Sequence, residues 1–154
     1  MFDVIPVTSP LRTDCGATCM KMLLAYYGQE VSMEDMIVEC KTRLIGCTAK
    51  DLLRVGRAHG LDMLAFEESA DDLITQDRPA IIWWKNAHWC VFCGLDDAGN
   101  VAICDPDRGR YRMCFDTFAS MYTGVAICNG RPDDLIPADY WGENNPVPDY
   151  FENE

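Results

Sequence analysis

Helix signals fill the first half of the chain and strand signals fill the second half, and this order constrains the fold more than any other feature. Residues 32–35 and 48–51 each place Ser or Thr three positions before Asp, which is the spacing of a capping box at a helix start. Gly28 and Gly60 supply stop signals of the kind found just after helix ends. The pattern predicts helices over residues 15–27, 33–41 and 49–59.

Apolar runs rich in aromatic and β-branched residues dominate from residue 79 onward, and turn residues separate them. Residues 96–100 and 105–109 have the composition of tight turns, Asp-Asp-Ala-Gly-Asn and Asp-Pro-Asp-Arg-Gly. Because the elements do not alternate, we expect an α+β fold with N-terminal helices packed on a C-terminal antiparallel sheet. The predicted strands are 61–66, 79–84, 88–95, 101–104, 111–114 and 125–128, and short helices are expected over 69–76 and 116–122.

The size and charge of the chain exclude several classes of function. Its 154 residues are enough for one domain with its own hydrophobic core. The formal net charge of −12 opposes binding to nucleic-acid phosphates or to an anionic membrane surface. No apolar run approaches the roughly 18 residues of a membrane-spanning helix, and the N-terminus lacks a signal-peptide pattern. We therefore expect no nucleic-acid partner and no membrane insertion.

Nine cysteines are an odd number, and their spacings do not repeat as a disulfide framework would. Reduced, mostly buried thiols in a cytoplasmic protein fit this pattern, and delivery to a host or target cell by a non-classical route stays open. Cys90 and Cys93 have the spacing of a zinc site, but a strand points such side chains to opposite faces. We expect neither a metal ion nor another cofactor.

The last 26 residues differ in composition from the rest of the chain. Residues 129–154 contain four prolines and seven acidic residues, with one basic residue. Such a segment continues neither a helix nor a central strand, so we assign residues 1–128 to the domain and residues 129–154 to an irregular tail. Its four aromatic residues favour packing against the domain or a partner protein, while a terminus without a role is the alternative.

Cys15, His88 and Asp105 are the candidate catalytic residues. A thiol in the first turn of a helix faces unpaired backbone N–H groups and the positive end of the helix dipole, which favour the thiolate. An imidazole at a strand mouth can act as a base, and a carboxylate on the neighbouring strand can fix its tautomer. Gly16 is expected to let a substrate backbone approach. His59 ends a predicted helix and is assigned a structural role.

These residues and the segments around them resemble one peptidase family. Residues 13–28, Thr-Asp-Cys-Gly-Ala-Thr-Cys followed by a helical run to Gly28, look like the nucleophile helix of the bacteriocin-processing, double-glycine leader peptidases. Residues 46–53 and 79–84, then His88, then Asp105-Pro106, follow in the order of that family. The resemblance implies a papain-like cysteine peptidase fold, with Cys15 as nucleophile, His88 as base and Asp105 as orienting group.

One part of the family's pattern differs in this sequence. The family resembles papain in placing a glutamine six residues before the nucleophile, where its amide holds the oxyanion, and this position is Ser9. Thr8 and Thr13 are other hydroxyl donors nearby. The remaining candidates for an oxyanion site or substrate groove are Asp14, Gly16, Trp84 and Asn86.

We therefore predict a cysteine peptidase that cleaves a peptide or protein amide bond through a thioester. The family's domain usually precedes a transporter and cuts after two glycines, and this chain contains neither, so a free-standing enzyme acting on another protein is expected. Two alternatives stay open. One is a weak or inactive peptidase-like domain that binds a peptide or partner protein, and the other is an acyl or peptidyl transferase that passes the thioester to an amine.

Overall fold

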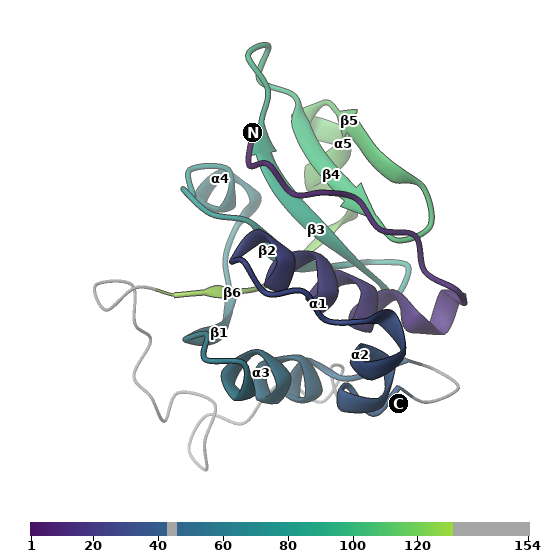
Figure 1. Cartoon of the computed structure of the whole chain (residues 1–154). Coiled ribbons are helices and arrows are strands. Elements are labelled where there is room, and N and C mark those ends of the chain that lie inside the picture. Colours follow the sequence, from purple (N-terminus) through teal and green to yellow (C-terminus); the bar gives the residue numbers. More distant parts are fainter. Residues whose placement is uncertain (43–45, 131–154) are drawn as a thin grey trace.

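The structure is a computed structural model, and it describes residues 1–42 and 46–130 (Figure 1). Within these residues, six antiparallel strands form one sheet in the order β1-β6-β2-β3-β4-β5. Every predicted strand is present, with ends shifted by a few residues. The strands are β1 Met63–Glu67, β2 Ala80–Trp84, β3 His88–Leu95, β4 Val101–Asp105, β5 Gly109–Met113 and β6 Tyr122–Asn129.

Helices lie on both faces of this sheet. The three helices that precede the strands in sequence pack on one face, where Leu23, Leu52 and Val91 belong to one hydrophobic cluster. The other two helices contribute Leu73 and Phe118 to a second cluster on the other face. This arrangement confirms the predicted α+β architecture. The helices are α1 Cys15–Tyr26, α2 Met33–Glu39, α3 Ala49–Ala58, α4 Ala70–Leu73 and α5 Phe115–Met121.

Helices begin at both predicted capping boxes, and the reciprocal pair of hydrogen bonds forms at the second one. The Ser32 side chain accepts a hydrogen bond from the Asp35 N–H at the start of α2. At the start of α3, Thr48 and Asp51 bond reciprocally, each side chain accepting from the other's backbone N–H at 3.1 Å. Helix α1 begins differently, because a single 3-10 turn, η1 (Arg12–Asp14), leads directly into Cys15.

The N-terminal segment, for which no element was predicted, crosses β3 and β4 as an extended strap (Figure 1). The Phe2 N–H donates to the Cys93 carbonyl at 2.7 Å, and the Ser9 N–H donates to the Pro106 carbonyl at 2.8 Å. Between these two bonds, the Val4 side chain is fully buried. The strap therefore holds the start of α1 close to the end of β4.

Strand β6 ends at Asn129, which pairs with Met63, so the last strand includes the first residue of the predicted tail. Residues 131–154, where the rest of the tail and its four aromatic residues fall, lie outside the described residues. No helix in the described ranges combines the length and apolarity needed to cross a membrane.

Candidate active site

The structure brings Cys15 and His88 to one cavity. Cys15 is the first residue of α1, and His88 is the first residue of β3, the strand against which α1 packs. Both predicted positions, a helix start and a strand mouth, are therefore observed. Cys15 is 7% exposed and His88 is 4% exposed, so each side chain reaches solvent only through this opening. The cavity measures about 140 Å³ and is lined by Arg12, Thr13, Cys15, Gly46, Cys47, Trp83, Ala87, His88 and Trp89.

Asp105 holds the His88 ring and is not among the residues that line this cavity. It is the last residue of β4, and its Oδ1 lies 3.0 Å from Nε2 of His88. The same carboxylate accepts hydrogen bonds from the Asp107 N–H at 2.7 Å and from the Tyr111 hydroxyl at 3.1 Å. A carboxylate held by three partners fixes the orientation of the imidazole, and it leaves Nδ1 of His88 for other partners.

These contacts favour a charged pair of imidazolium and carboxylate. Burial opposes protonation of His88, but hydrogen bonds to Asp105, Cys15 and Cys90 outweigh it and raise the pKa of His88 to about 12. Burial also opposes ionisation of Asp105, yet its hydrogen bonds to His88 and to the Asp107 N–H lower its pKa to about 2. The raised pKa of His88 and the lowered pKa of Asp105 both favour the charged form, so His88 carries a positive charge and Asp105 a negative charge at neutral pH.

A second cysteine, Cys90, lies beneath His88 on the same face of β3. Its Sγ accepts a hydrogen bond from the Trp84 indole N–H at 2.6 Å, and burial raises the pKa of this thiol to about 12. By donor type, His88, Cys90 and Asp105 are the residues that could hold a metal ion in the described part of the chain, since their ligand atoms lie within 4.8 Å of one another. Cys93 belongs to the hydrophobic cluster on the opposite face of the sheet, as predicted from the strand geometry.

The tryptophan beside the cavity is Trp83, and this corrects the prediction that Trp84 lines the groove. Trp83 and Trp89 pair across β2 and β3 with ring centroids 4.4 Å apart, and both line the cavity. Trp84 is 1% exposed on the other face of the sheet, packed edge-on against Phe118. Asn86 is exposed in the turn between β2 and β3 and is not among the residues that line the cavity.

Gly16 is required for packing, and the substrate-approach role predicted for it does not fit its surroundings. A Cβ atom at this position would lie 2.4 Å from the Cys47 Sγ and 3.1 Å from the Trp89 Cδ1. Both neighbours are protein side chains that are already buried, so the space over Gly16 is filled. The missing side chain lets α1 approach Cys47 and Trp89 closely, which brings Cys15 to the cavity.

The predicted oxyanion candidates Ser9 and Asp14 are engaged elsewhere. The Ser9 hydroxyl lies 2.8 Å from the Thr18 hydroxyl, and the Asp14 carboxylate accepts from the Leu11 N–H at 3.2 Å. The Cys15 N–H donates to the Arg12 carbonyl within the 3-10 turn. Neither Ser9 nor Asp14 is among the residues that line the cavity.

The sequence analysis did not identify Asp107 and Tyr111, which hold Asp105. It assigned His59 a structural role, and the structure agrees with that assignment. Asp107 lies in the turn between β4 and β5, and Tyr111 lies on β5. A tyrosine six positions after Asp105, across a predicted tight turn, was the signal in the sequence that could have identified this partner. His59 lies at the end of α3, where its Nε2 is 2.7 Å from the Glu39 carboxylate. Neither His59 nor Glu39 is among the residues that line the cavity.

Comparison with known proteins agrees with this geometry. The Peptidase C39 family matches residues 7–133 of the chain. The processing and transport ATP-binding protein LagD of Lactococcus lactis subsp. lactis, named for lactococcin G, is 27% identical over 120 residues. That match covers 74% of this chain and 17% of LagD. The chain therefore spans about a sixth of the length of this relative.

The chain is also similar to a second curated protease and to a solved peptidase structure. Cysteine protease effector 1 of Escherichia coli O1:K1:H7 is 29% identical over 126 residues, which cover 75% of this chain and 24% of the effector. The crystal structure of a double-glycine motif protease from an AMS/PCAT transporter, in complex with the leader peptide, superposes with a TM-score of 0.78 and 26% identity. It covers 82% of this chain and 91% of that one. With residues 7–133 matched and the papain-like arrangement of helices on an antiparallel sheet in common, the chain belongs to the Peptidase C39 family of cysteine peptidases.

Proposed function

We propose that Cys15, His88 and Asp105 form the catalytic triad of this cysteine peptidase. The observation that carries the proposal is the environment of His88, which lines one cavity with Cys15 and has Asp105 at 3.0 Å from its Nε2. A thiolate beside an imidazolium is the activated pair that attacks carbonyl carbons in such enzymes. The raised pKa of His88, to about 12, supports the charged form of this pair at neutral pH.

The reaction follows from these positions. The Cys15 thiolate attacks the carbonyl carbon, and the resulting oxyanion collapses to a thioester as the C–N bond breaks. His88 gives its proton to the leaving amine, then takes a proton from water that attacks the thioester and releases the acid and the thiolate. Asp105 stays ionised and stabilises the imidazolium form of His88 through its hydrogen bond at 3.0 Å.

Thr13 is the hydroxyl that we propose as a donor to the oxyanion. It lines the cavity beside Cys15, whereas the Ser9 hydroxyl is bonded to Thr18. Removing a single oxyanion donor costs about 10²–10³ in kcat, so Thr13→Val should lower kcat by that factor. Thr13→Ser keeps the hydroxyl and is the matched control. A Thr13→Val enzyme with unchanged kcat would remove Thr13 from this role.

The substrate class that we propose is a peptide with small residues before the scissile bond. The cavity beside Cys15 is small, and its walls are the buried Cys47 and Trp89 with the half-buried Trp83. The double-glycine motif protease, which was crystallised with a leader peptide, supports the same choice. Peptides with Gly-Gly before the scissile bond should therefore be cleaved with higher kcat/KM than matched peptides with Phe or Leu there.

The decisive experiment combines turnover with site-mapped alkylation. Cys15→Ala and His88→Ala should each abolish peptide cleavage, while Cys19→Ala, the same change one helical turn later at a fully buried thiol, should leave it. Iodoacetamide should label Cys15 in the wild type and much less in His88→Ala. The exposed Cys114 should label equally in both and serves as the internal standard. Cleavage that persists in Cys15→Ala or His88→Ala would refute the triad. A peptide product joined to an added amine, in place of the free acid, would indicate a transferase.

A further inference from the structure

Cys90 contacts His88, yet it takes part in no step of the proposed peptidase chemistry. It follows His88 by two positions on β3, so both side chains point to the same face of the sheet. The pairing of Val91 with Cys104 places Asp105, the next residue of β4, opposite Cys90. An imidazole, a thiol and a carboxylate therefore meet on one face of the sheet.

This trio of side chains has the donor types and the spacing of a metal site. One ligand atom from each of His88, Cys90 and Asp105 lies within 4.8 Å of the other two. The His88 Nε2 and the Asp105 Oδ1 are already 3.0 Å apart. Zinc binds imidazole nitrogen, thiolate sulfur and carboxylate oxygen at about 2.0–2.3 Å, so its tetrahedral ligand atoms lie about 3.3–3.6 Å from one another. A movement of about 1 Å would bring the three atoms to that spacing.

Hydrogen-bond donors already orient the two ligands that become anions. The Cys90 Sγ accepts from the Trp84 indole N–H at 2.6 Å. The Asp105 carboxylate accepts from the Asp107 N–H at 2.7 Å and from the Tyr111 hydroxyl at 3.1 Å. Donors of this kind fix the direction of metal ligands and stabilise their negative charge. The thiol and the carboxylate are therefore supported in place before an ion arrives.

The net charge of the cluster stays the same when a divalent cation binds. Without a metal, His88 is cationic, Asp105 is anionic and Cys90 is neutral, because burial raises the pKa of the Cys90 thiol to about 12. The divalent ion replaces the imidazolium proton and the thiol proton, and both protons leave to solvent. Two positive charges enter as two depart, so binding buries no uncompensated charge.

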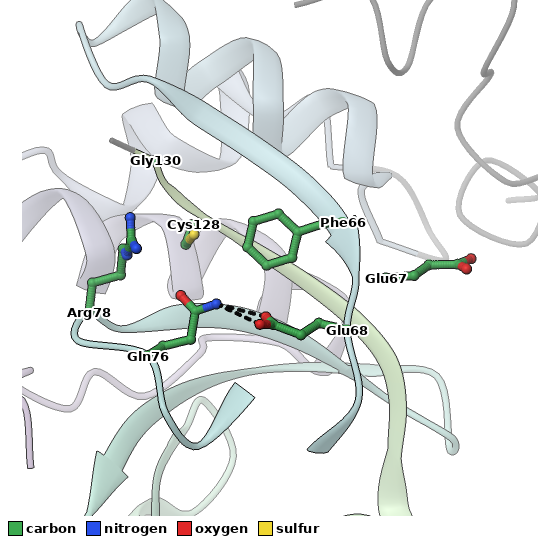
Figure 2. Close-up of a pocket in the computed structure, with 7 residues that line it drawn as sticks. All are labelled: Phe66, Glu67, Glu68, Gln76, Arg78, Cys128 and Gly130. Atoms are coloured by element: carbon green, nitrogen blue, oxygen red, sulfur yellow. Dashed lines mark hydrogen bonds between the residues drawn. The ribbon is translucent and has the colours of Figure 1, made fainter. Parts of the chain in front are cut away.

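Sulfur and carboxylate groups around a second cavity do not form such a cluster. This cavity measures about 240 Å³, and Cys128 and Glu68 are among its lining residues (Figure 2). Glu68 accepts two hydrogen bonds from the Gln76 amide, at 2.9 and 2.7 Å, which Figure 2 shows as dashed lines. Within residues 1–42 and 46–130, the trio that includes Cys90 is the group whose donor atoms lie close enough to share an ion. Cys128, a buried thiol near carboxylates, therefore provides a matched control.

We propose that His88, Cys90 and Asp105 bind a zinc ion that reversibly inhibits the peptidase. The ion enters through the cavity that His88 lines together with Cys15. With zinc on one ring nitrogen, the imidazole cannot form the doubly protonated imidazolium that gives a proton to the leaving amine. A water molecule takes the fourth tetrahedral position, so the Cys15 sulfur is not a required ligand. The inhibition rests on the proposed function of His88, whereas the metal binding does not.

Titration of the reduced full chain with Co²⁺ tests metal binding without an activity assay. Co²⁺ replaces zinc at mixed nitrogen, sulfur and oxygen sites, and a thiolate ligand gives it an intense near-ultraviolet charge-transfer band. The wild type, Cys15→Ala and Cys128→Ala should all show this band at one ion per chain. Cys90→Ala and Cys90→Ser should lose it, and the serine keeps an acceptor for the Trp84 N–H. Trp84→Phe removes only that donor and should weaken Co²⁺ binding about 10–100-fold, which tests the site even if both Cys90 variants fail to fold.

Zinc inhibition of peptide cleavage is the second measurement. The Zn²⁺ concentration that halves the rate is compared with the zinc-free rate of the same variant. Loss of an outer partner of a metal ligand already costs about 10–100-fold in affinity, so this concentration should rise by more than about tenfold in Cys90→Ser. It should be unchanged in Cys128→Ala, and a chelator should restore the rate of the wild type.

Three results would overturn the proposal. The first is a wild-type chain that shows no thiolate–cobalt band with Co²⁺ in large excess. The second is a band that is lost in Cys15→Ala or kept in the Cys90 variants, since the ion would then lie on Cys15. The third is equal zinc inhibition of Cys90→Ser and the wild type. Cleavage by Cys15→Ala would refute the triad and leave the cobalt result unchanged, so the two proposals fail separately.

Discussion

Replacing Gly16 by alanine tests how α1 is held against the sheet. The new Cβ would lie 2.4 Å from the Cys47 Sγ, whereas ordinary contacts begin at 3.4 Å, so the two atoms must separate by about 1 Å. Cys47 is 2% exposed, and Trp89 stands 3.1 Å from the same point, so the sulfur has little room to retreat. Overpacking of this kind costs about 1–3 kcal/mol, and the better helix propensity of alanine returns at most about 1 kcal/mol.

Thermal unfolding measures this balance. For a chain of this length, each kcal/mol shifts the Tm by roughly 2–4 °C, so Gly16→Ala should lower it by a few degrees. Cys47→Ala removes the opposing sulfur, and the double variant Gly16→Ala/Cys47→Ala should therefore be more stable than the sum of the two single changes predicts. Cys128→Ala removes a thiol from the cluster on the other face of the sheet, so it should add to Gly16→Ala without any such rescue.

The same variants separate packing from substrate approach. If Gly16 served mainly to admit a substrate backbone, Gly16→Ala would keep the wild-type Tm and raise KM. Adding Cys47→Ala would then leave KM raised. A Tm that is unchanged in Gly16→Ala, or a double variant whose losses simply add, would refute the packing argument.

Three other predictions concern the surroundings of the cavity. Tyr111→Phe removes a hydrogen bond that lowers the pKa of Asp105, so kcat/KM should fall by on the order of tenfold and its acidic limb should move to higher pH, which a purely structural loss would not cause. The pKa of Asp105 is lowered from 3.8 to about 2, so its ionised form stabilises the fold above pH 3.8; the stability difference between the wild type and Asp105→Asn, measured by denaturant unfolding, should shrink as the pH falls from 3.8 to 2. Trp83→Ala should raise KM for a peptide substrate, whereas Trp84→Phe should lower the Tm with little change in kcat/KM, because Trp83 lines the cavity and Trp84 does not.

Local signals in the sequence were sufficient to place the candidate catalytic residues along the chain. The first turn of a helix at Cys15, the strand mouth at His88 and the strand end at Asp105 all follow from caps, apolar runs and turn residues. Ser32 and Thr48 both cap helices, because an N-cap bond depends only on residues three positions apart.

Those local signals could not predict features that depend on which face of the sheet a helix covers. Trp83 and Trp84 are neighbours on one strand, so they point to opposite faces, and their apolar character is the same. Only the packing of α1 against β3 decides that Trp83 lines the cavity while Trp84 is buried beside Phe118. The role of Gly16 was missed for the same reason, since Cys47 is 31 positions away in sequence and meets it only in the folded chain.

Two cysteines contact His88, and their surroundings explain why Cys15 is the proposed nucleophile. Cys90 is fully buried beneath the ring and accepts the Trp84 N–H, and burial raises the pKa of its thiol to about 12, so it stays neutral. Cys15 lines the cavity at the start of α1, where the helix dipole favours negative charge and a carbonyl carbon can arrive. The choice between the two sulfurs is thus made by access and by the local field. Alkylation in the folded enzyme should therefore modify Cys15 and spare Cys90, and unfolding should abolish that difference.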